Sequence, residues 1–148
     1  MSGSTLYERD FHAWAEQQAR LLRTGQLAEA DIAHIAEEIE SMGRSEKREL
    51  VNRLAVLLTH LLRWRFQAGL RSTSWRLTIE EQRTRLADHL DDNPSLRAIL
   101  PAALGQAWRL ARLGAAQETG LERENFPPDL PWSFTEIANP AFWPDTAP

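Results

Sequence analysis

Three residues with metal-binding side chains follow one another at helical spacing: Asp31, His34 and Glu38. Spacings of three and four residues place them on one flank of a helix. A neutral imidazole with carboxylates suits Zn, Fe or Mn, and a carboxylate three residues before a histidine is half of a di-iron bundle motif. No second copy of this motif stands near His60 or His89. The alternatives are a metal site, and a structural role in which Asp31 caps the helix and Glu38 pairs with an arginine.

A second candidate is a run of arginines and aromatic residues that spans the break between two predicted helices. Residues 60–85 hold six arginines in this run and two glutamates: Arg63, Arg65, Arg71, Arg76, Arg83, Arg85, Glu80 and Glu81. Such a patch could bind phosphates while its aromatic side chains stack on bases. Burial of a large apolar side chain contributes about 1.5–3 kcal/mol, against about 0.5–1 kcal/mol for an exposed cation–π contact. We therefore expect Trp64 and Trp75 to turn inward and the arginines to fan outward.

The charge of the chain is unevenly distributed. Residues 1–43 carry 3 basic and 8 acidic side chains, residues 44–97 carry 11 and 7, and residues 98–148 carry 3 and 6. The basic middle can pair with the acidic ends of its own chain, or leave a positive face for a partner. Three alternatives stay open for Arg63, Arg65, Arg71 and Arg76: an acidic protein partner, nucleic acid, and internal pairing.

Gln82 is a polar residue at a position where an apolar one is expected. It falls in the helical stripe of Trp75, Ile79 and Leu86. An unpaired buried amide costs about 1–3 kcal/mol, so a buried Gln82 needs partners. We predict a buried polar residue that fixes helix register, with the polar floor of a small pocket as the alternative.

The sequence favours no enzymatic chemistry and predicts no particular cofactor. The chain has no cysteine, and it lacks a glycine-rich phosphate loop, a nucleophile elbow and an HExxH motif. The opening residues contain no apolar signal-peptide stretch, and the longest apolar run, residues 54–62, is shorter than the roughly 20 residues that a bilayer requires. We expect a cytoplasmic protein with no membrane segment.

Helical periodicity extends over most of the chain, so we predict an all-α fold. Helices are expected from a Thr5–Glu8 capping box to Gly25, from about residue 28 to Gly43, from Ser45 to about residue 66, from Thr73 or Ser74 to about residue 92, and from Pro101 to Gly120. Pro94 is expected at the first position of a helical segment.

The remaining residues read as a C-terminal strap. Residues 121–148 are rich in proline and aromatic residues, and Ser133 with Glu136 forms a capping box. Phe126, Trp132, Phe134, Phe142 and Trp143 carry too much apolar surface to stay in water. We predict one domain over residues 1–148: a helical bundle of four to five main helices, about 5–120, crossed by this strap.

Several blocks of the sequence resemble one bacterial family. The blocks are "YERDFHAWAEQQARLLRTGQL", "DIAHIAEEIESMGRSEKRELVNRL", "HLLRWRFQ", "SWRLTIEEQR" and "ETGL…FP". Together they resemble the domain of unknown function 29, over about residues 7–143. The resemblance implies a small, cytosolic helical protein and brings no activity, substrate or cofactor. The family's late helix often has an "EAY" type of stretch, where this sequence reads "GQAW" at residues 105–108.

The leading hypothesis from the sequence is a non-enzymatic protein-interaction module that uses its Arg-rich face. The alternatives are a metal- or small-molecule-dependent enzyme around His34 and Glu38, and a nucleic-acid-binding protein. A homo-oligomer is compatible with each of these hypotheses.

Overall fold

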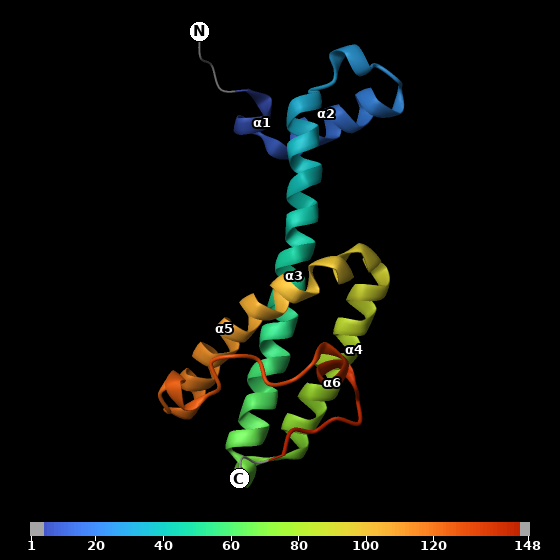
Figure 1. Cartoon of the computed structure of the whole chain (residues 1–148). Coiled ribbons are helices and arrows are strands. Elements are labelled where there is room, and N and C mark those ends of the chain that lie inside the picture. The colour runs from blue at the N-terminus through green and yellow to red at the C-terminus, as the bar shows by residue number, and fades with distance from the viewer. Residues whose placement is uncertain (1–4, 146–148) are drawn as a thin grey trace. The chain divides into compact units, whose positions relative to one another are not determined.

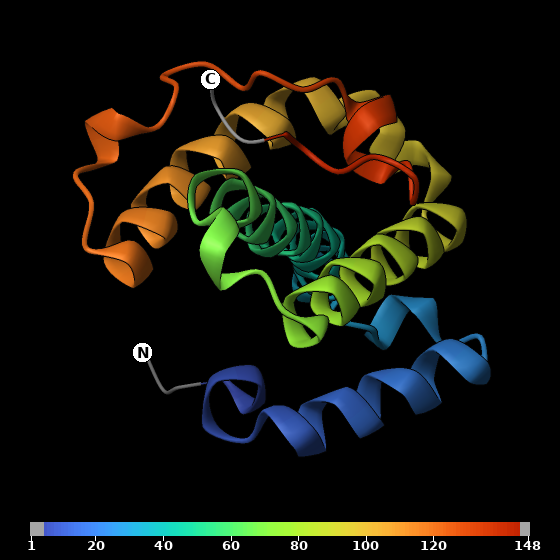
Figure 2. The same ribbon diagram turned by 90° about the horizontal axis from the view of Figure 1, so that it is seen from below.

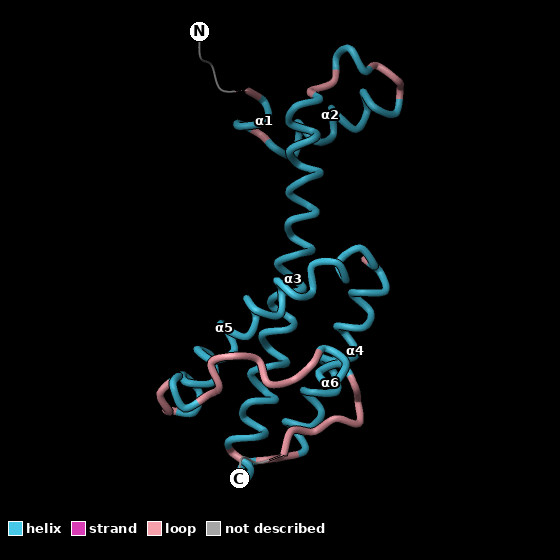
Figure 3. Tube along the Cα trace, viewed as in Figure 1, coloured by secondary structure: helices cyan, strands magenta, loops and turns pink. Residues whose placement is uncertain are grey.

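The computed structural model describes residues 5–145, and its fold is all-α. No strand occurs among these residues (Figure 3). The α-helices are α1 (Leu6–Arg9), α2 (Phe11–Arg23), α3 (Ile32–Phe66), α4 (Thr73–Asp92), α5 (Leu100–Thr119) and α6 (Phe134–Ala138), as labelled in Figure 1. Short 3₁₀ helices are η1 (Leu27–Glu29), η2 (Ala68–Leu70), η3 (Pro94–Ile99) and η4 (Arg123–Asn125).

The chain divides into two compact units, residues 1–45 and residues 46–148, which we call unit 1 and unit 2. The single domain expected from the sequence stays a prediction. Helix α3 contributes its first part to unit 1 and the rest to unit 2. Within residues 5–145, no helix combines the length and apolar character needed to cross a membrane.

Unit 1 consists of α1, α2, η1 and the start of α3. Asp10 separates α1 from α2, and its carboxylate accepts a hydrogen bond from the backbone N–H of Ala13 at 3.1 Å. The expected single first helix is therefore two helices, because an aspartate whose carboxylate accepts from the first turn is a favourable N-cap. Gly25 ends the α2 segment with a positive φ of 73°, as the sequence predicted.

Unit 2 has a leucine-rich core formed by α3, α4 and α5. In Figure 2 the C-terminal part of α3 lies between α4 and α5. Leu54, Leu58 and Leu61 of α3 are fully buried, together with Ile79 of α4 and Ala107 of α5. Each fully buried leucine contributes about 1.5–3 kcal/mol of transfer free energy. This core fixes the relative positions of α3 and α4, the two helices that carry the site described below.

The predicted break at Gly43 is wrong, because α3, which is 35 residues long, runs through this position without interruption. Gly43 does not have a positive φ, so its backbone does not turn out of the helix. Arg44 and Glu40 form an i,i+4 ion pair of 3.8 Å across this position. Such a pair offsets part of the roughly 1 kcal/mol that a glycine costs inside a helix.

The other predicted helix ends hold with two shifts. The helix expected from about residue 28 begins at Ile32, after the 3₁₀ helix η1. The N-cap of α4 is Ser72, whose hydroxyl accepts from the N–H of Trp75 at 3.2 Å, rather than Thr73 or Ser74. Pro94 begins η3, and Gly120 ends α5 with a φ of 75°. The capping box of Ser133 and Glu136 begins α6.

The C-terminal strap packs on the helices of unit 2. Trp108 of α5 donates its indole N–H to the carbonyl of Pro127 at 3.1 Å and contacts Trp132 edge to face. Phe126 packs against Phe66 at a centroid separation of 5.2 Å. Phe126 and Trp132 are thus buried, and Phe134, Phe142 and Trp143 are partly buried against the same core.

Candidate functional site

The residues predicted as a metal site lie in unit 1 and are engaged in two separate pairs. His34 Nδ1 lies 2.7 Å from Asp31 Oδ2, which also accepts from the indole N–H of Trp14 at 3.1 Å. Glu38 instead accepts from the Tyr7 hydroxyl at 2.6 Å. The structure therefore joins Asp31 to His34 and gives Glu38 a different partner.

Aromatic rings complete this cluster. The Tyr7 ring stacks on the His34 ring at 4.0 Å with an interplanar angle of 14°. The hydrogen bond to Glu38 raises the pKa of Tyr7 to about 12. The hydrogen bond from His34 lowers the pKa of Asp31 below its ordinary value, with a further contribution from Trp14. These contacts hold α1 and α2 against the start of α3, which is a structural role for Asp31, His34 and Glu38.

The four arginines predicted to form a partner-binding face contact aromatic rings of their own chain. Arg63 lies over Trp75 at 4.3 Å and pairs with Glu118 of α5. Arg65 lies over the Phe66 ring at 5.2 Å. Both guanidinium groups thus already have partners within unit 2.

The other two arginines of this face lie on tryptophans. Arg71 donates to the Trp64 carbonyl at 2.8 Å and lies over the Trp64 ring, while Arg76 lies over Trp143 at 4.7 Å. Trp64 itself is buried, as the sequence predicted, and Trp75 is partly buried against the core. Of the four arginines, Arg76 alone is exposed, and the other three are partly buried.

The buried polar side chain of α4 is Arg83 rather than Gln82. Gln82 is only partly buried, whereas Arg83 is 4% exposed. Arg83 donates to the carbonyls of Ile137 at 2.8 Å and Phe142 at 2.7 Å, and burial lowers the pKa of its guanidinium. The expected position was wrong by one residue because the strap covers the adjacent flank of α4, and a flexible arginine can bury its stem and still reach carbonyls.

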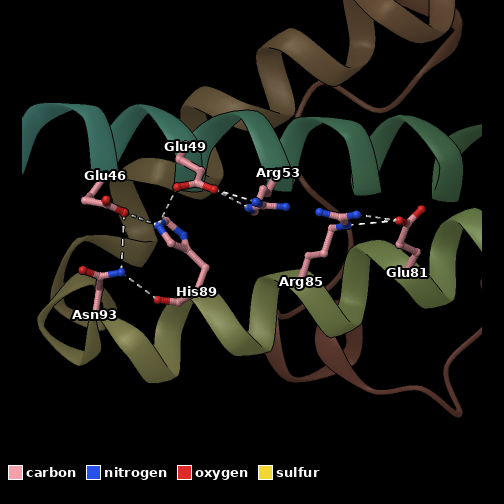
Figure 4. Close-up of polar contacts among 7 residues, drawn as sticks. All are labelled: Glu46, Glu49, Arg53, Glu81, Arg85, His89 and Asn93. Carbon is pink, nitrogen blue, oxygen red and sulfur yellow. Dashed lines mark hydrogen bonds and ion pairs between the residues drawn. The ribbon is translucent and has the colours of Figure 1, made fainter.

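A histidine–carboxylate cluster that the sequence analysis did not predict lies in unit 2. Glu46 and Glu49 stand three residues apart on α3, and His89 of α4 points toward both (Figure 4). His89 Nε2 lies 2.7 Å from Glu46 Oε2 and 3.3 Å from Glu49 Oε2. One ligand atom from each of the three residues lies within 4.8 Å of the others, and no other such group occurs among residues 5–145.

Neighbouring side chains orient this cluster. Arg53 donates from its Nε to Glu49 Oε1 at 3.0 Å, which leaves Oε2 free to face His89. The Arg53 hydrogen bond lowers the pKa of Glu49, and the nearby charge of His89 contributes. Asn93 donates to the His89 carbonyl at 3.1 Å. His89 is 7% exposed, and its second ring nitrogen, Nδ1, is buried without a hydrogen-bond partner.

The cluster opens into a depression of about 450 Å³ on unit 2. Its lining residues are Glu46, Glu49, Arg53, Arg85, Asp88, His89, Asp92 and Asn93. Four carboxylates therefore face two guanidinium groups, and Arg85 is already paired with Glu81 at 2.9 Å. The depression has a net negative charge suited to a cation.

The fold and this cluster define an all-α protein with a histidine–carboxylate group between two packed helices. The family model for the domain of unknown function DUF29 matches residues 6–143, and the chain belongs to this family. No curated protein and no solved structure matches the chain.

Proposed function

We propose that the protein is a non-enzymatic interaction module that binds a helical segment of a partner protein through one face of α3. The observation that carries this proposal is the exposure of three large apolar side chains on the part of α3 that belongs to unit 1: Ile32 is 55%, Ile39 63% and Met42 68% exposed. Single exposed apolar residues are ordinary, whereas a contiguous set is typical of a binding surface.

These residues form a regular seam, which we call the α3 stripe: Ile32, Ile39 and Met42. With Ile35 they follow the three–four spacing of the a and d positions in a coiled coil. Ala36 and Gly43 beside the stripe are small and exposed, which allows a second helix to approach closely.

The flank that borders one side of the stripe already has partners. His34 and Glu38 contact α1 through Tyr7. Helix α1 is therefore engaged on the flank that carries these two residues, and the stripe is left without a covering helix in unit 1. A helix from a partner protein would supply the missing neighbour.

Charge indicates which kind of helix fits. Residues 1–45 carry 4 basic and 8 acidic side chains, whereas residues 46–148 carry 13 of each. Glu37 and Glu40 are exposed on the same part of α3, outside the seam, and add to its negative charge. An amphipathic helix with an apolar seam and flanking lysines or arginines complements this surface, whereas a second copy of the chain would bring two negative units together.

The Arg-rich face and its acidic partner remain a second prediction for the same class of function. Its support is weaker, because Arg63, Arg65 and Arg71 are partly buried on aromatic rings. A cytoplasmic location is part of the proposal, and the absence of cysteine supports it.

Fluorescence anisotropy with two labelled synthetic helical peptides tests the proposal. Both peptides carry leucine at a and d; one has lysine at e and g, and the other has glutamate there. We expect the lysine peptide to bind more tightly at low salt and to lose at least about 10-fold in affinity on Ile39→Asp, because that change removes a contact worth roughly 1.5–3 kcal/mol.

The matched control is Leu77→Asp, at an α4 residue that is 57% exposed, and it should leave the affinity unchanged. Equal binding by wild type and Ile39→Asp would contradict the proposal. A dimer in light scattering that Ile39→Asp dissociates would assign the stripe to a second copy instead. Binding of the glutamate peptide that is lost on Arg76→Glu would move the function to the Arg-rich face.

A further inference from the structure

We propose that Glu46, Glu49 and His89 of unit 2 form a binding site for a divalent first-row transition-metal ion. Imidazole nitrogen with carboxylate oxygen is a ligand set that zinc, iron(II) and manganese(II) accept. This site is separate from the α3 stripe and from the Asp31, His34 and Glu38 flank.

The spacing of the three ligand atoms fits a metal. Metal–ligand bonds of about 2.0–2.2 Å place neighbouring ligand atoms about 3.0–3.5 Å apart. His89 Nε2 stands 2.7 Å from Glu46 Oε2 and 3.3 Å from Glu49 Oε2. A small opening of the first contact therefore admits an ion without any movement of the backbone.

The ligands come from rigid elements. Glu46 and Glu49 lie on one face of α3, and His89 lies on α4, two helices joined by the buried leucine core. Leu50 follows Glu49 directly and Leu90 follows His89, and both leucines are fully or almost fully buried. Sites on packed helices hold their geometry better than sites on loops.

The charged residues around the three ligands favour the binding of a cation. Arg53 holds Glu49 through Oε1, so that Oε2 is directed to His89, as outer groups commonly orient metal ligands. Asp88 and Asp92 add negative charge to the same depression. The depression is open, so water can complete the coordination sphere.

One feature of the ring limits the expected affinity. A metal on Nε2 leaves the proton on Nδ1, and Nδ1 is buried without a partner. The outer hydrogen bond that usually supports a metal-bound histidine is thus missing, and its loss typically costs about 10–100-fold in affinity. We expect micromolar binding rather than the tighter binding of a structural zinc site.

Isothermal titration of the chelator-treated full chain with Zn²⁺ and Mn²⁺ near neutral pH tests this inference. The expected result is one ion per chain for at least one of the two metals, weakened by more than about 10-fold in His89→Gln and in Glu49→Gln. Circular dichroism will show whether His89→Gln folds. If it does not, Glu46→Gln, at a half-exposed position, replaces it as the test variant. His60→Gln is the matched control on α3, since His60 hydrogen-bonds to the Val56 carbonyl of its own helix.

Three results would overturn the inference. The first is no binding of either ion, which would leave the cluster as an ion pair between α3 and α4. The second is binding that persists unchanged in His89→Gln and Glu46→Gln. The third is binding that is lost in His34→Gln, which would place the metal on Asp31, His34 and Glu38.

Discussion

His34 in unit 1 and His89 in unit 2 both lie next to carboxylates, but their surroundings differ. The His34 side chain is 31% exposed, pairs with Asp31 of the same helix turn and is covered by the Tyr7 ring. His89 is 7% exposed and reaches from α4 to two glutamates on α3. In the first arrangement His34 already has a neighbouring carboxylate and a covering ring as partners. The second gathers two carboxylates around one ring, and this is the arrangement that a cation can complete.

The two units also differ in what they leave exposed. Unit 2 has a large buried core, to which Arg83 holds the strap, and its exposed apolar side chains, such as Leu77, are spread over several elements. Unit 1 has one large buried aromatic residue, Trp14, and leaves the α3 stripe uncovered. Side chains that are covered by their own unit have a structural role, whereas a contiguous exposed apolar surface indicates a binding partner.

The largest effect is expected from the loss of the hydrogen bonds by which Arg83 holds the strap in unit 2. Arg83→Met should lower the free energy of unfolding by about 2–4 kcal/mol, because it leaves buried carbonyls without donors. Urea unfolding followed by circular dichroism measures this loss. Arg85→Met, at an exposed residue two positions later, should cost under about 1 kcal/mol. Equal losses in the two variants would show that Arg83 does not hold the strap.

The second prediction compares the stability that is lost when each of the two histidines is replaced by alanine. His89→Ala should lower the free energy of unfolding by about 2–3 kcal/mol in the presence of chelator, through the cavity and the unpaired glutamates that it leaves. His34→Ala should cost less, because its side chain is more exposed. Thermal unfolding of the two variants provides the measurement, and a larger loss for His34→Ala would reverse our view of the two clusters.

A third prediction concerns Tyr7, the only tyrosine in the chain. Its phenol should ionise near pH 12 rather than near its ordinary 10.0, because the protonated hydroxyl donates to Glu38. A raised folded-state pKa means that the stability from this bond is present below the ordinary pKa and is lost as pH rises through the folded value. Absorbance of tyrosinate measures the midpoint, and Glu38→Gln should lower it. A midpoint near the ordinary value, with helicity intact, would show that the bond is absent.

The smallest expected effect is on the acid side of the same cluster. Since the Asp31 pKa is lowered, its contribution to stability is present above the ordinary value of 3.8 and is lost as pH falls through the folded value. The indole N–H resonance of Trp14, assigned with Trp14→Phe, should show an acid transition with a midpoint below 3.8. An acid midpoint at or above 3.8 would contradict the lowered pKa.

Local signals predicted much of the fold. Gly120, Pro94 and the Ser133–Glu136 box each act within one helical turn, so the sequence alone places them correctly. Gly43 was misread, because a glycine in mid-helix differs from a C-terminal glycine only in backbone conformation, which composition does not reveal.

The candidate sites were predicted less well, because they depend on packing between elements. Gln82 was chosen over Arg83 from the periodicity of α4 alone, without the strap that covers Arg83. Glu46 and Glu49 did leave a signal, since they stand seven residues after Ile39 and Met42 and replace apolar residues in that register. Their partner His89 is 40 or more positions away, and only the fold brings it to them.

The most direct test of the proposed function is hydrogen–deuterium exchange of the full chain with and without the lysine-flanked helical peptide. We expect slower exchange over residues 32–45, which carry the α3 stripe, and no change over residues 60–85. Protection confined to residues 60–85, or no protection anywhere at saturating peptide, would contradict the claim that the stripe is the binding surface.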